Sequence, residues 1–201
     1  MLSLKGKNNG FSSIYKILTN QKIYKIYNKI AFSKYFRDRQ SEFKKLFKEV
    51  HNLKLSVNHK VISRNIIEID ELKSDQNLSI RRLFNNNKLL KNFLKQIKKI
   101  SSIDKKVSSR KIINEIDNYV RHSSRHQKIN NKIGKLKKYI EVYDQNKICH
   151  GDLHLKNIFI KKNRFLFLDW DYFILSSSGY DLAMFAYLEN LNQKQINKIS
   201  L

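Results

Sequence analysis

The chain has 201 residues and a formal net charge of +24, from 41 Lys and Arg against 17 Asp and Glu. Its 41% hydrophobic content, with 11% aromatics, is typical of a chain that folds around a core and excludes a disordered basic tail. No apolar run approaches the roughly 18 residues of a membrane span, and the first residues lack the apolar core of a signal peptide. One cysteine excludes a disulfide framework, so we expect a cytoplasmic protein.

The positive charge is spread along the whole chain. Asn and Ile are abundant, Pro is absent and Gly occurs five times, a pattern typical of an AT-rich coding bias rather than of a basic patch. We therefore expect non-specific binding of nucleic acid at most, with a basic RNA-associated module as the alternative. We expect no membrane partner, and a monomer.

The N-terminal segment predicts short strands. Residues 6–11 contain two glycines, and alternating apolar residues then predict strands over 14–17 and 22–27. Glycines beside a strand let backbone N–H groups approach phosphates. The sequence therefore suggests nucleotide contacts at Gly6, Asn9 and Gly10.

The next elements change from helix to strand and back to helix. Residues 37–42 open a helix with an apolar stripe, and a strand pair follows over 61–64 and 65–69. Helical periodicity then dominates. The apolar stripe of the first helix consists of Phe43, Leu46, Phe47 and Val50. The later helical segments are expected over 89–100, 112–120 and 129–140. We therefore place a strand-rich N-terminal lobe at 1–73 and a helical C-terminal lobe at 74–201.

The most informative segment is His-Gly-Asp-Leu-His-Leu-Lys-Asn at 150–157, followed by Leu-Asp-Trp-Asp at 168–171. Residues 158–160 and 165–168, with a turn at 161–163, predict a hairpin that presents Asn157 and Asp169 toward one cleft. Phosphoryl transfer needs a base for the acceptor hydroxyl and oxygen ligands for Mg²⁺. Asp152 is the candidate base, and Asn157 and Asp169 are the candidate metal ligands. A His-x-Asp alone is weak evidence, but this ordered set is not.

These motifs resemble the aminoglycoside phosphotransferase and choline kinase family, whose kinase-like C-lobe carries H-G-D-x-H-x-x-N and a later D-W-D/E. The resemblance implies an α+β, protein-kinase-like two-lobe fold with a small antiparallel β N-lobe, a mainly helical C-lobe and ATP between them. It implies that Lys25 holds the phosphates and pairs with Glu42, and that backbone groups near Glu68 and Ile69 bind adenine.

Bacterial thiamine kinases and choline kinases are the nearest patterns within the family. Both phosphorylate the hydroxyethyl group of an organic cation that contains a quaternary nitrogen, so the resemblance implies an ATP-dependent kinase with Mg²⁺ and a small cationic alcohol, thiamine first and choline second. An aminoglycoside is a further alternative as the acceptor. Asp171, Tyr172 and Glu189 are acceptor candidates, since cations bind carboxylates and aromatic faces.

Other residues near the motif are expected to support it. His150 is expected to pack and hydrogen-bond the loop, with His154 as a further support, and Asp181 to tie a helix start to the same loop. Cys149 and Trp170 are expected to be buried.

One departure from the family concerns length. Members usually continue through further C-terminal helices, whereas this chain stops at Leu201. We therefore expect a minimal acceptor pocket, or a nucleotide-binding pseudokinase as the alternative from another functional class.

Overall fold

The computed structural model divides by its contacts into two units. The first comprises Met1–Leu78 and Ile158–Leu168, and the second Ser79–Asn157 and Asp169–Leu201. The helices expected over 112–120 and 129–140 lie outside the described residues. Those residues are 4–8, 12–17, 22–27, 36–73, 78–103 and 147–200, and in the first two ranges the description is of the backbone alone.

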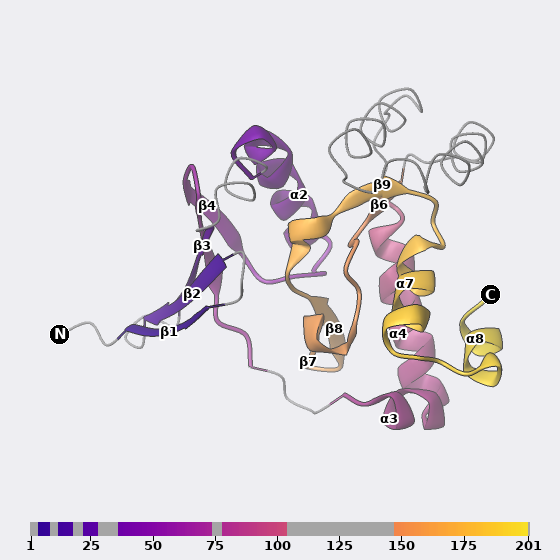
Figure 1. Cartoon of the computed structure of the whole chain (residues 1–201). Coiled ribbons are helices and arrows are strands. Elements are labelled where there is room, and N and C mark those ends of the chain that lie inside the picture. Colours follow the sequence, from indigo (N-terminus) through magenta and orange to yellow (C-terminus); the bar gives the residue numbers. More distant parts are fainter. Residues whose placement is uncertain are drawn as a thin grey trace, which may run out of the picture. The chain divides into compact units, whose positions relative to one another are not determined.

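The first unit is built on a five-stranded antiparallel sheet in the order β1-β2-β3-β5-β4 (Figure 1). Strands β2, β4 and β5 match expected strands within a few residues, and β3 begins and ends where the sequence predicts. The bounds are Leu4–Asn8 for β1, Ser12–Ile17 for β2, Lys22–Tyr27 for β3, His59–Ser63 for β4 and Ile66–Asp70 for β5.

Strand β1 is a difference from the sequence-based expectation. Gly6 begins a segment expected to be a loop, yet it lies in β1 opposite Tyr15 of β2. Pairing with β2 overrides the weak strand propensity of glycine and asparagine, because strand formation depends more on neighbours than on intrinsic preference.

Helix α2, Gln40–Asn52, packs on this sheet (Figure 1). Its expected apolar stripe, from Phe43 to Val50, is buried. The Phe47 ring stacks on the His59 ring of β4 with centroids 4.7 Å apart. The helix ends in a Schellman turn, in which Lys54 N–H donates to the His51 carbonyl and Leu55 N–H to the Val50 carbonyl.

The predicted hairpin forms from β7, Ile158–Lys161, and β8, Arg164–Phe167. Lys162 and Asn163 both have left-handed backbones, which is the conformation of a type I′ turn. Phe167 N–H donates to the Leu55 carbonyl at 2.7 Å. This bond joins the hairpin to the segment that follows α2. The hairpin therefore belongs to the first unit, although it lies far from the rest of that unit in the sequence.

The second unit is mainly helical. The ring centroids of Phe93 of α4 and Phe185 of α7 lie 5.1 Å apart, and the two helices run side by side (Figure 1). Leu90, Phe93, Ile97 and Ile100 of α4 are buried, and a short antiparallel pair, β6 with β9, completes the unit. Bounds are Ile80–Asn85 for α3, Asn87–Ile100 for α4, Lys147–Cys149 for β6, Ile174–Ser176 for β9, Tyr180–Leu188 for α7 and Gln193–Ile199 for α8.

These two units confirm the expected α+β class. Helix α3 was not expected, because six residues are too few to show a helical period. Among the helices that the structure describes, none is long and apolar enough to cross a membrane.

The buried Cys149 thiol at the end of β6 gives a pH-dependent test. Burial raises the pKa of this thiol well above its ordinary value, so it stays protonated where free thiols ionise. We expect the native protein to react with a disulfide reagent at least about a hundredfold more slowly than the unfolded chain at pH 8. Raising the pH from 7 to 9 should increase the native rate far less than that of a free thiol. Rapid native labelling at pH 8 would contradict this account.

Candidate active site

A buried carboxylate fixes the start of the loop at 150–157. Asp181 lies in the first turn of α7, where its two oxygens accept the backbone N–H groups of His150 at 2.8 Å and Gly151 at 3.1 Å. Burial raises the pKa of Asp181, while the His150 side chain and the two N–H donors act in the opposite direction. The carboxylate thereby joins the helix to the loop.

A second carboxylate, at the other end of α7, holds the same loop further on. Glu189 follows the last residue of the helix, and its Oε1 accepts the N–H of Leu155 at 2.7 Å. Leu155 opens the short 3-10 helix Leu155–Asn157. Helix α7 therefore supports the loop at both ends. The sequence suggested that Glu189 binds the alcohol that accepts the phosphoryl group, whereas its observed contact is to the backbone of the loop.

The two histidines of the motif pack differently. His150 is fully buried, its ring lies 4.6 Å from that of Trp170, and its Nδ1 accepts a long bond of 3.4 Å from Asp152 N–H. His154 is half-buried, and its Nε2 lies 3.5 Å from Asp152 Oδ2 while its Nδ1 accepts the N–H of Lys156. Both rings thus surround the Asp152 turn.

Gly151 is required by its surroundings. Its φ is +83°, and a Cβ at this position would lie 1.9 Å from the carbonyl oxygen of Tyr172. Only glycine combines a left-handed backbone with so close an approach to another chain segment. Tyr172 ends the 3-10 helix Trp170–Tyr172, so this contact sets the loop beside the segment that carries Asp169.

Asp152 and Asn157 are directly connected. The Asn157 amide nitrogen donates to the Asp152 carbonyl at 2.9 Å and to its Oδ2 at 3.3 Å. Asn157 is 8% exposed, and its amide oxygen accepts no hydrogen bond from the residues that the structure describes. A buried amide oxygen without a donor is suited to a hard cation. The Asp152 side chain is 31% exposed and open to a ligand.

Asp169 has a left-handed backbone with φ of 65° and opens the 3-10 helix Trp170–Tyr172. Non-glycine residues in this region are uncommon and concentrate at functional sites. Asp171 and Trp170 are buried, and Tyr172 is 41% exposed. Trp170 and Cys149 are thus core residues, as expected. No group of three His, Cys, Asp or Glu side chains suited to a metal occurs in the described segments.

The N-terminal candidates lie in the first unit. Lys25 on β3 is 6% exposed and its Nζ lies 5.6 Å from the centre of the Tyr27 ring. Glu42 on α2 accepts from Arg39 Nε at 2.9 Å. Asn9 and Gly10 lie outside the described residues, so their role stays a prediction.

The expected hinge residues lie on β5, between β3 and β4. Glu68 accepts the Tyr24 hydroxyl at 2.6 Å, and Ile69 is paired with both neighbouring strands. A nucleotide role for Lys25, Glu42, Glu68 and Ile69 stays a prediction.

Comparisons with known proteins agree with this geometry. Residues 109–196 match the model of the phosphotransferase enzyme family. The structure of choline kinase LicA from Streptococcus pneumoniae is similar with a TM-score of 0.72 at 17% identity, covering 98% of this chain and 73% of that one. The chain has the fold of the protein-kinase-like phosphotransferases. The family resemblance expected from the motifs is confirmed.

Further relatives share this phosphotransferase fold. An ethanolamine kinase from Plasmodium vivax has a TM-score of 0.66 at 14% identity, over 98% of this chain and 66% of that one. The ternary complex of streptomycin and ATP with APH(2'')-IIa has a TM-score of 0.61 at 13% identity, over 98% and 77%. In sequence, a LicA homologue of Metamycoplasma hominis is 26% identical over 136 residues, which cover 68% of this chain. The aligned part spans 44% of that relative.

Two features of the site were not anticipated from sequence. The close approach of Gly151 to Tyr172 had one signal, namely that glycine is scarce in this chain and yet occurs in the motif. The bond from Leu155 N–H to the Glu189 carboxylate spans 34 positions and leaves no local pattern.

Substituting Gly151 by alanine should disrupt the loop. The added Cβ would meet the Tyr172 carbonyl and occupy a left-handed backbone, so we expect a loss of about 2 kcal/mol or more in unfolding free energy. Gly179→Ala is the matched control, since nothing lies within 4 Å of its Cβ position, and it should change stability by less than about 1 kcal/mol. Chemical denaturation measures both. Equal effects would show that the Gly151 contact is unimportant.

The Glu189 bond can be tested by amide hydrogen exchange. Glu189→Ala removes the acceptor of Leu155 N–H, so protection of the peptide containing Leu155 should fall roughly tenfold to a hundredfold. Glu189→Gln retains an acceptor oxygen and should keep most of the protection. Unchanged exchange in the alanine variant would mean that Glu189 does not hold the loop.

Proposed function

We propose that this protein is an ATP-dependent phosphotransferase that transfers a phosphoryl group to the hydroxyl of a small organic alcohol. The observation that carries the proposal is the direct connection of Asp152 to Asn157, with the amide oxygen of Asn157 left without a donor in the described part of the chain. The fold shared with choline kinase, ethanolamine kinase and aminoglycoside-binding enzymes supports it.

In this proposal Asp152 is the base. Its partly exposed carboxylate orients the acceptor hydroxyl and accepts its proton while the new O–P bond forms and the bond to the leaving phosphate breaks. Asn157 and His154, which lie beside Asp152 Oδ2, keep the carboxylate in one orientation. Such positioning accounts for much of the rate enhancement in phosphoryl transfer.

The residues fit a Mg²⁺ ion, which Asn157 and Asp169 would hold. Amide and carboxylate oxygens are hard ligands, and Mg²⁺ is usually held by only one or two protein carboxylates together with waters and phosphate oxygens. When bound, the ion would neutralise charge on the phosphate oxygens. Lys25, buried in the sheet, is the proposed phosphate contact of the first unit.

For the acceptor, we propose a choline-like or ethanolamine-like alcohol ahead of thiamine. The sequence patterns favoured thiamine, but the relatives named above include a choline kinase, an ethanolamine kinase and a LicA homologue, and none of them is a thiamine kinase. Asp171 is buried and Tyr172 exposed, so Tyr172 is the more accessible candidate for a cation–π contact with a quaternary ammonium group.

Turnover with a panel of acceptors tests the proposal. Magnesium–ATP consumption is measured with choline, ethanolamine, thiamine and an aminosugar as separate acceptors, and product is identified by mass spectrometry. We expect stimulation by choline or ethanolamine and a loss of roughly a thousandfold in Asp152→Asn, because the general base is removed. ATP affinity should change little.

Asp38→Asn is the matched control, since Asp38 is an exposed aspartate of the first unit, and it should keep full activity. Normal turnover in Asp152→Asn would show that Asp152 is not the base. ATP binding without turnover on any acceptor would instead favour a nucleotide-binding pseudokinase.

A further inference from the structure

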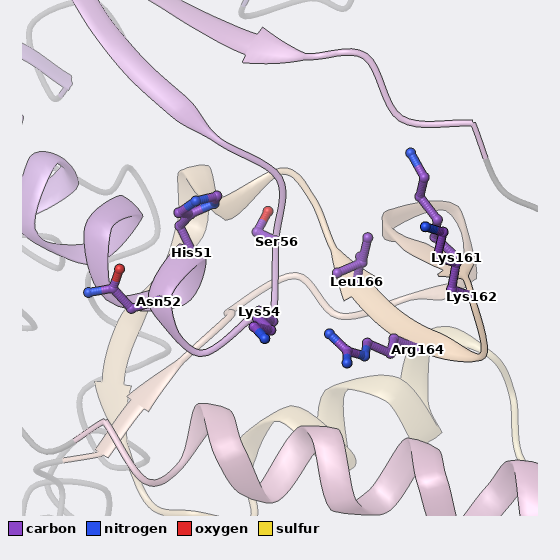
Figure 2. A pocket seen from close by; sticks show the side chains of 8 residues that line it. All are labelled: His51, Asn52, Lys54, Ser56, Lys161, Lys162, Arg164 and Leu166. Atoms are coloured by element: carbon purple, nitrogen blue, oxygen red, sulfur yellow. The ribbon is translucent and has the colours of Figure 1, made fainter.

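The first unit carries a pocket of about 710 Å³ whose charged lining is entirely basic (Figure 2). We propose that it binds a small anion with clustered phosphate groups; none of its lining residues belongs to the 150–157 loop that carries Asp152. Its volume lies in the range of small-molecule sites, roughly 300–1,000 Å³. The lining contains four cationic side chains and one histidine, namely Lys54, Lys161, Lys162, Arg164 and His51.

The pocket is formed by two segments that lie far apart in sequence. His51 lies in the last turn of α2 and Lys54 in the turn that follows it, and Lys161, Lys162 and Arg164 come from the β7–β8 hairpin. The Ser56 hydroxyl donates to the Phe167 carbonyl at 2.7 Å, a bond across 111 positions. This bond and the one from Phe167 N–H to the Leu55 carbonyl hold together the two backbone segments that carry these cations.

Several of these charges are not neutralised by the residues that the structure describes. Lys54, Lys161 and Arg164 make no ion pair and no side-chain hydrogen bond with any described residue. Like charges gathered in one pocket repel each other, and a bound anion relieves that repulsion.

A neighbouring pocket of about 470 Å³ shows the contrast. It shares His51 and Lys161 but contains Asp70 and Glu71, and there Asp70 hydrogen-bonds Lys22 and raises the pKa of that lysine. The charge of Lys22 is thus neutralised by a carboxylate of the protein, whereas the basic pocket has no acidic side chain in its lining. Charge therefore favours an external anion in the basic pocket alone.

Two of the lysines stand where backbone preference favours other residues. Lys54 occupies the left-handed position that closes the Schellman turn, where glycine is usual. Lys162 occupies the first left-handed position of the I′ turn, where asparagine or glycine is usual. Residues that oppose local conformational preference are typical of functional positions.

The lining favours phosphates over a nucleic-acid strand. Single-stranded nucleic acid is usually held by aromatic side chains on which bases stack, together with backbone contacts. The basic pocket contains no Phe, Tyr or Trp, and His51 supplies its one ring. Its cations suit charged oxygens, for which Lys and Arg give strong charge-assisted bonds.

Inorganic tripolyphosphate is the probe, titrated into the full chain by calorimetry at about 0.15 M salt, where diffuse surface charge is screened. The variant is Lys54→Gly with Lys162→Asn, which removes two cations and relaxes both left-handed positions. We expect its affinity for tripolyphosphate to fall roughly tenfold or more, because two charge-assisted contacts are lost. Its melting temperature should stay the same or rise.

The matched control is Lys44→Gln with Lys45→Gln, which removes the same charge from exposed positions on α2 outside the pocket. Its affinity should change less than about twofold at this salt. Equal losses in the two double variants, or no binding by the wild type, would overturn the proposal.

Two further titrations identify the ligand class. Orthophosphate should bind much more weakly than tripolyphosphate, because it reaches fewer of the cations, and equal affinity would overturn the requirement for clustered phosphates. Short oligouridylate should bind no more tightly than tripolyphosphate. Tighter binding that is lost in the Lys54→Gly, Lys162→Asn variant would overturn the proposal in favour of a nucleic-acid site.

Discussion

The hydrogen bonds from His150 and Gly151 to the Asp181 carboxylate are the interaction on which the candidate site depends. A carboxylate in the first turn of a helix is favoured by the helix dipole, and here it also satisfies two backbone donors of a neighbouring loop. Hydrogen bonds to charged groups contribute about 1.5–3 kcal/mol each. Removing the carboxylate would leave the buried N–H of His150 and the half-buried N–H of Gly151 without this partner.

The rest of the loop follows from that attachment. Because the loop begins at a fixed point on α7, Gly151 must pass against the Tyr172 carbonyl, and His150 is pressed against Trp170. Glu189 then holds the loop at Leu155. Between these supports lies Asp152, whose carboxylate is partly exposed while its surroundings are packed. Fixed supports beneath a reactive group are what an efficient catalytic site requires.

Electrostatics operates on two scales in this protein. The net charge of +24 is distributed along the chain and gives a general attraction for anions that salt screens. The basic pocket of the first unit differs, because the hydrogen bonds from Phe167 N–H to the Leu55 carbonyl and from the Ser56 hydroxyl to the Phe167 carbonyl hold together the segments that carry its cations. A formal charge counted from composition does not distinguish these cases, since the distinction rests on which cations are held together and which are already paired.

The sequence by itself determined the local elements and the motif. Alternating apolar residues predicted β3, and an apolar stripe at helical spacing predicted α2. The order of Asp152, Asn157 and Asp169 indicated phosphoryl-transfer chemistry. These features are local, so spacing and residue type are enough to reveal them. Tertiary structure alone decided that Gly6 lies in a strand, that Glu189 reaches the backbone of Leu155, and that Lys54 and Arg164 share a pocket. Each of these depends on pairing or packing between segments, and the free energy of such contacts leaves no periodic trace in either segment.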